Sequence, residues 1–239
     1  MKRVRIVRKE EIADGTLAVY LERPPGFEYR AGQYAFFAIP KDPRGERLER
    51  HFTFASAPYE KELMFATRMR EGSDYKRALL SCSAGAELEM EGPYGEFLLR
   101  DDEQGPLVGI AGGIGITPFF SIIKDAKERR VTRPITLFYS DRDPDSAAFL
   151  EEIYGIAEDM PGSRMVATMT DTDGSRGEFS WEGERGQITE DMVRRYVEAP
   201  HKALFYASGP FDMVRAAKDM VRGMGVLDSR LRTETFSGY

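Results

Sequence analysis

The run Pro106–Phe119 has residue types and spacing that suit the binding of a phosphate group. An apolar stretch ends in a cluster of glycines, and Thr117 and Pro118 then open an amphipathic segment; the glycines are Gly112, Gly113 and Gly115. Glycine lets a backbone turn tightly and approach a ligand without a Cβ in the way. With Thr117 as N-cap and Pro118 at the first helical position, free amide groups at a helix start would face an anion. The third glycine of the Rossmann fingerprint is absent, so these residues alone predict either a pyrophosphate site or only a tight turn.

The run Arg50–Thr53 contains a cation at Arg50, an aromatic ring at Phe52 and a hydroxyl at Thr53. On a strand, Arg50 and Phe52 share one face with Phe54, and Thr53 lies on the other face. An isoalloxazine with a charged tail requires an arginine for its phosphate, a ring for stacking and an oxygen near N5. The same residues also suit a surface charge beside a core aromatic, so this run alone leaves both interpretations open.

The composition argues against several classes of site. The chain has 239 residues, 41% of them hydrophobic, and a formal net charge of −6, which disfavours nucleic-acid binding. Cys82 is the only cysteine, and His51 and His201 are the only histidines. We therefore expect no disulfide, no cysteine-held iron–sulfur cluster and no metal site in this chain. It shows no signal-peptide pattern and no apolar run of about 18 residues, so we expect a cytoplasmic protein without a membrane span.

Residues 1–100 are expected to form a six-stranded antiparallel barrel. Turn residues recur at short intervals between alternating runs. The predicted strands are Arg3–Ile12, Thr16–Glu22, Gln33–Ile39, His51–Ser56, Glu62–Arg68 and Glu87–Glu91, with one helix over Ser73–Ser83. The candidate flavin residues at Arg50–Thr53 therefore lie on a barrel strand.

Residues 106–239, after a polar linker at Asp101–Gly105, are expected to form a doubly wound parallel sheet. Apolar strands there alternate with helical segments. The predicted strands are Leu107–Ala111, Ile135–Ser140, Met165–Met169 and Ala203–Ala207, and the predicted helices are Thr117–Lys127, Ser146–Ala157, Thr189–Val197 and Phe211–Gly223. Ligands bind such a sheet outside the carboxyl ends of its strands, which favours the pyrophosphate interpretation of the glycine cluster.

Five motifs, in order along the chain, resemble those of the ferredoxin–NADP reductase superfamily. The similar segments are Arg50–Thr53 (RxYS), Gly92–Phe97 (GPxGxF), Gly112–Pro118 (GGxGxTP), Ser208–Met213 (CGPxxM) and Glu234–Tyr239 (ExFxGY). The resemblance implies a flavin-binding barrel followed by a nucleotide-binding domain. It also implies an enzyme that passes hydride from NADH or NADPH to bound FAD, and then electrons to a separate carrier such as ferredoxin or flavodoxin.

The resemblance implies roles for residues of the barrel. Arg50 would pair with the flavin phosphate, Phe52 would lie against the isoalloxazine in place of the family's tyrosine, and Thr53 would bond N5. Further cofactor contacts are expected from Thr67, Tyr75, Lys76 and Arg77. Lys76 stands where the family has the serine of its GxxS segment, which leaves the diphosphate to Lys76, Arg77 and backbone amides and favours FAD over FMN.

In the second domain the resemblance assigns the pyrophosphate to Gly112, Gly113, Thr117 and Pro118. It assigns the nicotinamide half to Gly209, Pro210 and Met213. Ser208, Glu234 and Tyr239 join Thr53 as the expected catalytic residues: Ser208 replaces the family's cysteine, Glu234 would exchange a proton and Tyr239 would cover the flavin. Ser140 and Arg142 suit the 2′-phosphate of NADPH, whereas Asp171 suits the ribose of NADH and favours that nucleotide.

Two other functions remain open. One is a reductase that treats flavin as a diffusible substrate, and the other is a non-catalytic nucleotide-binding subunit. A basic barrel surface made by Arg3, Arg5, Arg8, Lys9, Lys76 and Arg77 is expected to dock an acidic carrier.

Overall fold

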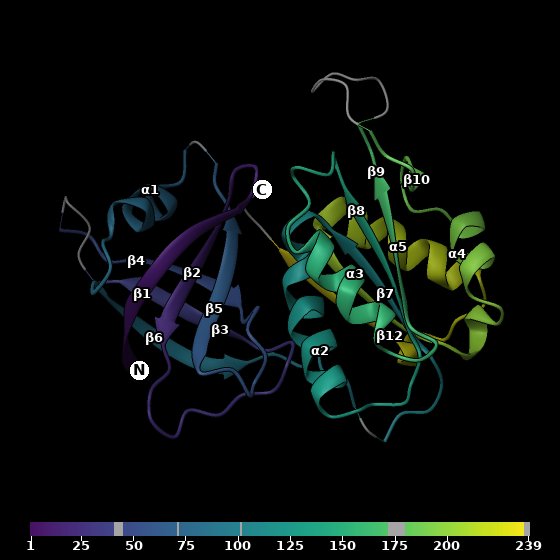
Figure 1. Ribbon diagram of the computed structural model, residues 1–239, viewed down its shortest axis with the longest axis horizontal. Coiled ribbons are helices and arrows are strands. Elements are labelled where there is room, and N and C mark those ends of the chain that lie inside the picture. The colour runs from purple at the N-terminus through teal and green to yellow at the C-terminus, as the bar shows by residue number, and fades with distance from the viewer. Residues whose placement is uncertain (41–44, 71, 101, 172–179, 237–239) are drawn as a thin grey trace.

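The computed structural model describes residues 1–40, 45–70, 72–100, 102–171 and 180–236. A sheet of antiparallel strands and a sheet of parallel strands lie side by side (Figure 1). Each has six strands, in the orders β4-β3-β6-β1-β2-β5 and β10-β9-β8-β7-β11-β12. The predicted fold class is therefore confirmed. Over the described residues, no helix is long and apolar enough to cross a bilayer.

The antiparallel sheet uses nearly all of the predicted strands. Its elements are β1 (Lys2–Ala13), β2 (Thr16–Glu22), β3 (Tyr34–Ile39), β4 (Leu48–Thr53), β5 (Glu62–Arg68), helix α1 (Asp74–Ser81) and β6 (Glu87–Tyr94). The predicted bounds of β4, His51–Ser56, were wrong. Past Thr53 the backbone changes partners, because the amide of Ala55 donates to the carbonyl of Met64 in β5 at 2.7 Å. This bond joins the chain just after β4 to β5 at the opposite edge of the sheet, and it leaves Thr53 at the end of β4.

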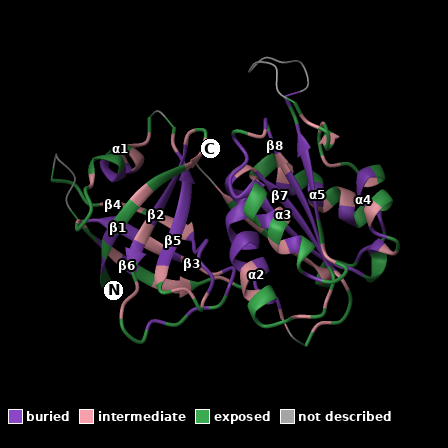
Figure 2. Cartoon of the chain, viewed as in Figure 1, coloured by how far each residue is buried: buried purple, intermediate pink, exposed green. Residues whose placement is uncertain are grey.

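The parallel sheet is covered by helices on both faces. Its elements are β7 (Leu107–Gly112), the 3₁₀ turn η1 (Gly113–Ile116), α2 (Thr117–Glu128), β8 (Ile135–Asp141), α3 (Leu150–Glu158), β9 (Arg164–Met169), β10 (Glu184–Arg185), α4 (Glu190–Tyr196), β11 (Leu204–Pro210), α5 (Phe211–Gly223) and β12 (Leu231–Phe236). Leu107 and Ala111 pack on the side of α2 and α3, whereas Val108 and Ile110 pack on the side of α4 and α5. The four central strands β7, β8, β9 and β11 are almost wholly buried (Figure 2).

The N-cap of α2, the start of α3 and two strands also differ from the sequence predictions. Thr117 is not an N-cap: it is the first residue of α2, and its hydroxyl donates to the carbonyl of Ile114 at 3.1 Å. Helix α3 starts at Leu150 and not at Ser146, because Phe149 takes a left-handed conformation (φ 60°) that interrupts the helix. The edge strands β10 and β12 were not predicted.

Buried polar contacts hold the antiparallel sheet and its loops against the helical half. The Ser121 hydroxyl of α2 donates to the Ser56 carbonyl at 2.6 Å, and Tyr206 of β11 donates to the carbonyl of Leu98 at 2.7 Å. Apolar packing crosses the same boundary, with Phe97 edge-on to Tyr206 at 5.1 Å between ring centroids. The boundary is therefore a packed interface in which residues of the two halves can form one site.

Candidate functional site

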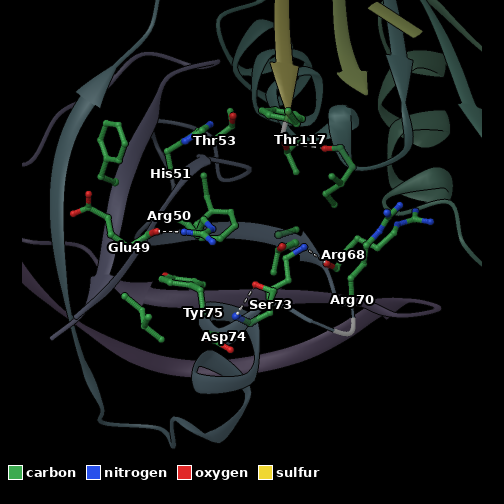
Figure 3. Close-up of a pocket in the computed structure, with 18 of the residues that line it drawn as sticks. Glu49, Arg50, His51, Thr53, Arg68, Arg70, Ser73, Asp74, Tyr75 and Thr117 are labelled. Atoms are coloured by element: carbon green, nitrogen blue, oxygen red, sulfur yellow. Dashed lines mark hydrogen bonds between the residues drawn. The ribbon is translucent and has the colours of Figure 1, made fainter. Parts of the chain in front are cut away.

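A cavity of about 760 Å³ opens where β4, β5 and α1 face the start of α2 and the end of β12. Figure 3 shows its lining side chains pointing toward a common space. Seven of the predicted site residues line it: Arg50, Phe52, Thr53, Thr67, Tyr75, Lys76 and Thr117. We call it the barrel cavity. The tertiary fold thus brings together candidates as far apart in the sequence as Arg50 and Thr117.

The barrel cavity carries an excess of positive charge. Four of its lining residues are cations, Arg50, Arg68, Arg70 and Lys76, against two carboxylates, Glu49 and Asp74. The amine of Lys76 donates to the carbonyl of Arg68 at 2.7 Å, and burial together with the nearby arginines lowers the Lys76 pKa. Helix α1 begins at this wall, with its first turn capped by the Ser73 hydroxyl. Cations and a helix N-terminus at one wall suit a diphosphate.

An aromatic platform forms another wall of the barrel cavity. The ring of Phe52 stacks on Phe65, with centroids 4.5 Å apart and planes 8° from parallel, and lies 5.6 Å from Tyr75. Phe65 is completely buried and so holds the Phe52 ring from the core side. The hydroxyl of Tyr75 is buried with no partner among the described residues, as is Oγ1 of Thr53. Unpaired buried hydroxyls in a cavity wall are what a polar ring system would satisfy.

Thr53, Ser208 and Glu234 bring three buried polar groups to the interface. Ser208 of β11 and Glu234 of β12 are direct neighbours in the parallel ladder. Ser208 Oγ and Glu234 Oε2 make no hydrogen bond within the described parts of the chain. Burial raises the pKa of Glu234 to about 7, and the nearby Thr53 hydroxyl opposes this rise. The three predicted catalytic side chains therefore form a water-poor polar cluster at the interface, whereas Tyr239 lies outside the described residues.

A second cavity of about 550 Å³ lies at the carboxyl ends of β7, β8 and β11. Six predicted residues line it: Gly112, Gly113, Ser140, Arg142, Pro210 and Met213. We call it the sheet cavity. Arg77, Pro118, Asp171 and Gly209 line neither cavity. Arg77 instead pairs with Asp74 on the surface of α1, and Asp171 is buried with its amide bonded to the carbonyl of Arg142.

The glycines of the predicted phosphate turn have different roles in the structure. Gly113 has φ +53° and open space where a Cβ would stand, so its backbone is free to approach a ligand. A Cβ on Gly115 would lie 2.2 Å from the carbonyl oxygen of Ser208, and one on Gly209 would lie 2.5 Å from the Met213 methyl group. Gly115 and Gly209 are therefore required for close packing between η1, β11 and α5.

Sequence reasoning missed Arg68 and Arg70, which line both cavities. Both side chains extend from the barrel toward the helical half (Figure 3). Their positions in the sequence could have indicated them. Arg68 ends the predicted strand that contains the candidate Thr67, and Arg70 follows just after it. His51 was also missed; burial, and then the charge of Arg50, lower its pKa.

Comparison with known proteins shows which families the chain resembles. The oxidoreductase NAD-binding domain family matches residues 110–219. The chain is 31% identical over 197 residues to the reductase component of propane 2-monooxygenase from Mycolicibacterium smegmatis, covering 81% of this chain and 55% of that protein. It is 25% identical over 221 residues to the ferredoxin–NAD(P)(+) reductase component of the naphthalene 1,2-dioxygenase system of Pseudomonas putida, covering 92% and 63%. The chain thus spans between 55% and 63% of the length of these two relatives.

Solved structures show the same architecture over the whole chain. The Amycolatopsis cytochrome P450 reductase GcoB superposes with a TM-score of 0.84 at 26% identity, covering 98% of this chain and 70% of that one. A ferredoxin NADP+ reductase from Neisseria gonorrhoeae, solved with bound FAD and NADP, gives 0.83 at 17% identity and covers 98% of both chains. With the motif order and the two-sheet fold, these matches show that the chain is similar, over both of its halves, to reductases of the ferredoxin–NAD(P) reductase superfamily.

Proposed function

We propose that this chain transfers hydride from NADH or NADPH to FAD and passes the electrons to a separate one-electron carrier. Residues 1–100 would hold the flavin in the barrel cavity, and residues 106–239 would hold the nucleotide in the sheet cavity. One observation carries the proposal: Arg68 and Arg70 line both cavities. The two cavities therefore adjoin at the interface, so ligands bound in each would meet there.

The residues of the barrel cavity fit a flavin dinucleotide. Arg50 and Lys76 would bind the diphosphate together with the N-terminus of α1, and the platform of Phe52 would orient the ring system. The unpaired hydroxyls of Thr53 and Tyr75 would supply its hydrogen bonds. FAD supplies hydride acceptance and the release of electrons one at a time.

The protein's own contribution is position and proton supply. The packed interface excludes water and fixes the two ligands relative to each other, which is where most of the rate gain in such transfers arises. Because its pKa is raised to about 7, Glu234 would be about half protonated at neutral pH and could take up or release a proton without a large free-energy cost. Ser208 beside it keeps a small polar group at the cluster.

The carrier is proposed from the relatives. Their names describe reductase components of oxygenase systems, one of them a ferredoxin–NAD(P)(+) reductase, so a ferredoxin-type carrier is the acceptor we propose. The basic docking surface expected on the barrel finds less support, because its cations on β1 and α1 already have partners; Arg77, for example, pairs with Asp74. Arg5 pairs with Glu87 at 3.4 Å, Arg8 pairs with Glu62 at 2.5 Å, and the Lys9 amine caps the C-terminus of α1.

An anaerobic titration tests the proposed function. The protein, purified with FAD and passed over a gel-filtration column, would be titrated with NADH and separately with NADPH while the absorbance of oxidised flavin is followed. We expect the protein to stay yellow on the column and to bleach stoichiometrically with at least one nucleotide. Loss of flavin on the column would favour the reductase of diffusible flavin. Retained flavin that neither nucleotide bleaches would contradict the proposal and favour a binding subunit.

A further inference from the structure

Arg68 makes a buried ion pair across the interface. It is the last residue of β5, and its Nη2 donates to Oδ2 of Asp141 at 2.8 Å and to the carbonyl of Ser146 at 2.9 Å. Its Nη1 lies 3.4 Å from the other carboxylate oxygen. The two side chains are only 9% and 3% exposed. One arginine of the antiparallel sheet therefore forms hydrogen bonds with both ends of the loop Asp141–Ser146.

Asp141 organises the rim of the sheet cavity. Its Oδ1 accepts the amide of Arg142 at 2.8 Å, its Oδ2 accepts the buried Tyr139 hydroxyl at 3.2 Å, and its carbonyl accepts the amide of Thr170 at 2.9 Å. Ser140, Arg142 and Thr170 all line the sheet cavity. Any movement of the Asp141 carboxylate would therefore displace the ends of β8 and β9 that form this rim.

The main chain of Arg68 is tied to the other site. Its carbonyl accepts the Lys76 amine at 2.7 Å, and Lys76 lies in the wall of the barrel cavity. A single residue is thus bonded to helix α1 on one side and to the loop Asp141–Ser146 on the other. Through these hydrogen bonds, Lys76, Arg68 and Asp141 connect the wall of the barrel cavity to the rim of the sheet cavity.

We propose that Arg68 is a positioning residue, which through Asp141 holds the rim of the sheet cavity at a fixed place relative to the barrel cavity. This inference rests on the proposed function. Its physical basis is that transfer between two bound ligands depends steeply on their separation and alignment. The antiparallel domain would then determine nucleotide affinity as well as flavin binding, although it contributes little of the sheet cavity's own wall.

The interface offers a matched control. Lys124 of α2 pairs with Glu60 at 2.8 Å, and its side chain is 11% exposed. This second ion pair also joins the two halves of the chain, but neither residue lines either cavity. Loss of the Lys124 pair should therefore weaken the interface without moving the rim.

The test compares R68M/D141L, R68K and K124M with the unmodified protein, all loaded with FAD. Replacing both members of a buried pair by apolar residues avoids an unpaired buried charge. For each protein the Kd of the oxidised nucleotide is measured by calorimetry, the limiting rate of flavin reduction by anaerobic stopped flow, and the thermal midpoint separately. We expect R68M/D141L to keep its FAD, to bind nucleotide about tenfold more weakly and to be reduced about tenfold more slowly.

The other variants separate positioning from stability. R68K keeps one charge but cannot hold both carboxylate oxygens and the carbonyl, so its Kd should lie between those of the double variant and the unmodified protein. K124M should change only the thermal midpoint. The positioning role would be overturned if the double variant kept a nucleotide Kd and a reduction rate within about twofold of those of the unmodified protein. If the double variant does not fold, the same comparison is made with R68K. If the unmodified protein binds neither nucleotide, the proposed function itself fails, and the role of Arg68 fails with it.

Discussion

Replacing Glu234 by glutamine should change how the stability of this protein depends on pH. The carboxyl has a buried Oε2 without a hydrogen-bond partner in the described chain, and burial raises its pKa from 4.5 to about 7. A carboxyl with a higher pKa in the folded chain than in the unfolded chain stabilises the fold most below the unfolded pKa. That stabilisation is lost as the pH rises through the folded pKa. Glutamine has the same shape and does not titrate.

The expected magnitude follows from the two pKa values. Their difference is worth about 3 kcal/mol in the free energy of unfolding, at about 1.36 kcal/mol for each pKa unit. Part of this is already lost by about pH 5.5, because the unfolded carboxyl titrates near 4.5. Between about pH 5.5 and about pH 8 the loss is about 2 kcal/mol. For a chain of this length that corresponds to roughly 4–8 °C in the thermal midpoint.

The measurement is denaturant unfolding of the unmodified protein and E234Q at both pH values, with the same FAD concentration throughout. All other groups titrate in both proteins, so the change in the stability difference isolates Glu234. Relative to the unmodified protein, E234Q should gain about 2 kcal/mol on going from the lower to the higher pH. E198Q, at an exposed position, controls for the replacement itself. A stability difference that is equal at the two pH values to within about 0.5 kcal/mol would refute the claim that burial raises the pKa of Glu234.

Four further substitutions test the site and its scaffold. Arg50→Ala should weaken FAD binding to the apoprotein about tenfold or more, because it removes a charge-assisted hydrogen bond; an unchanged Kd in a fluorescence titration would show that the phosphate contact is wrongly assigned. Thr53→Ala should slow flavin reduction in stopped flow while FAD affinity stays nearly unchanged, and equal loss of both would argue for a binding role. Gly115→Ala should destabilise the fold by about 1–3 kcal/mol, because its Cβ would meet the Ser208 carbonyl. Gly155→Ala, in open space on α3, should stabilise it by about 0.5–1 kcal/mol.

The sequence was sufficient to predict elements with strong local signals. Strand β5 and helix α5 were predicted with the bounds that they have in the structure, because alternation and helical periodicity are local properties of their residues. Strand β12 was missed because only its parallel ladder with β11 gives it an extended form. The start of α3 was misplaced because the left-handed turn at Phe149 depends on how the preceding loop is held.

The residues of the candidate site also fall into those that the sequence could indicate and those that it could not. Arg50, Phe52 and Gly113 were singled out by residue type and order, because binding a phosphate or a planar ring requires those types, and the resemblance to the superfamily then supplied their expected roles. The sequence could not show that Gly115 is needed for packing, since the atom it would meet belongs to Ser208, more than 90 positions away.

The amino-acid sequence by itself thus determined the two-domain fold class, the resemblance to the superfamily and thirteen of the residues that line the two cavities. Only the tertiary structure decided how the two sites are joined. In the sequence, Arg68 is an ordinary cation at the end of a predicted strand. In the fold it is buried against Asp141, which lies 73 positions further along the chain. Burial and long-range pairing are set by the packing of the domains. The raised pKa of Glu234 and the link between the two cavities both arise from that packing.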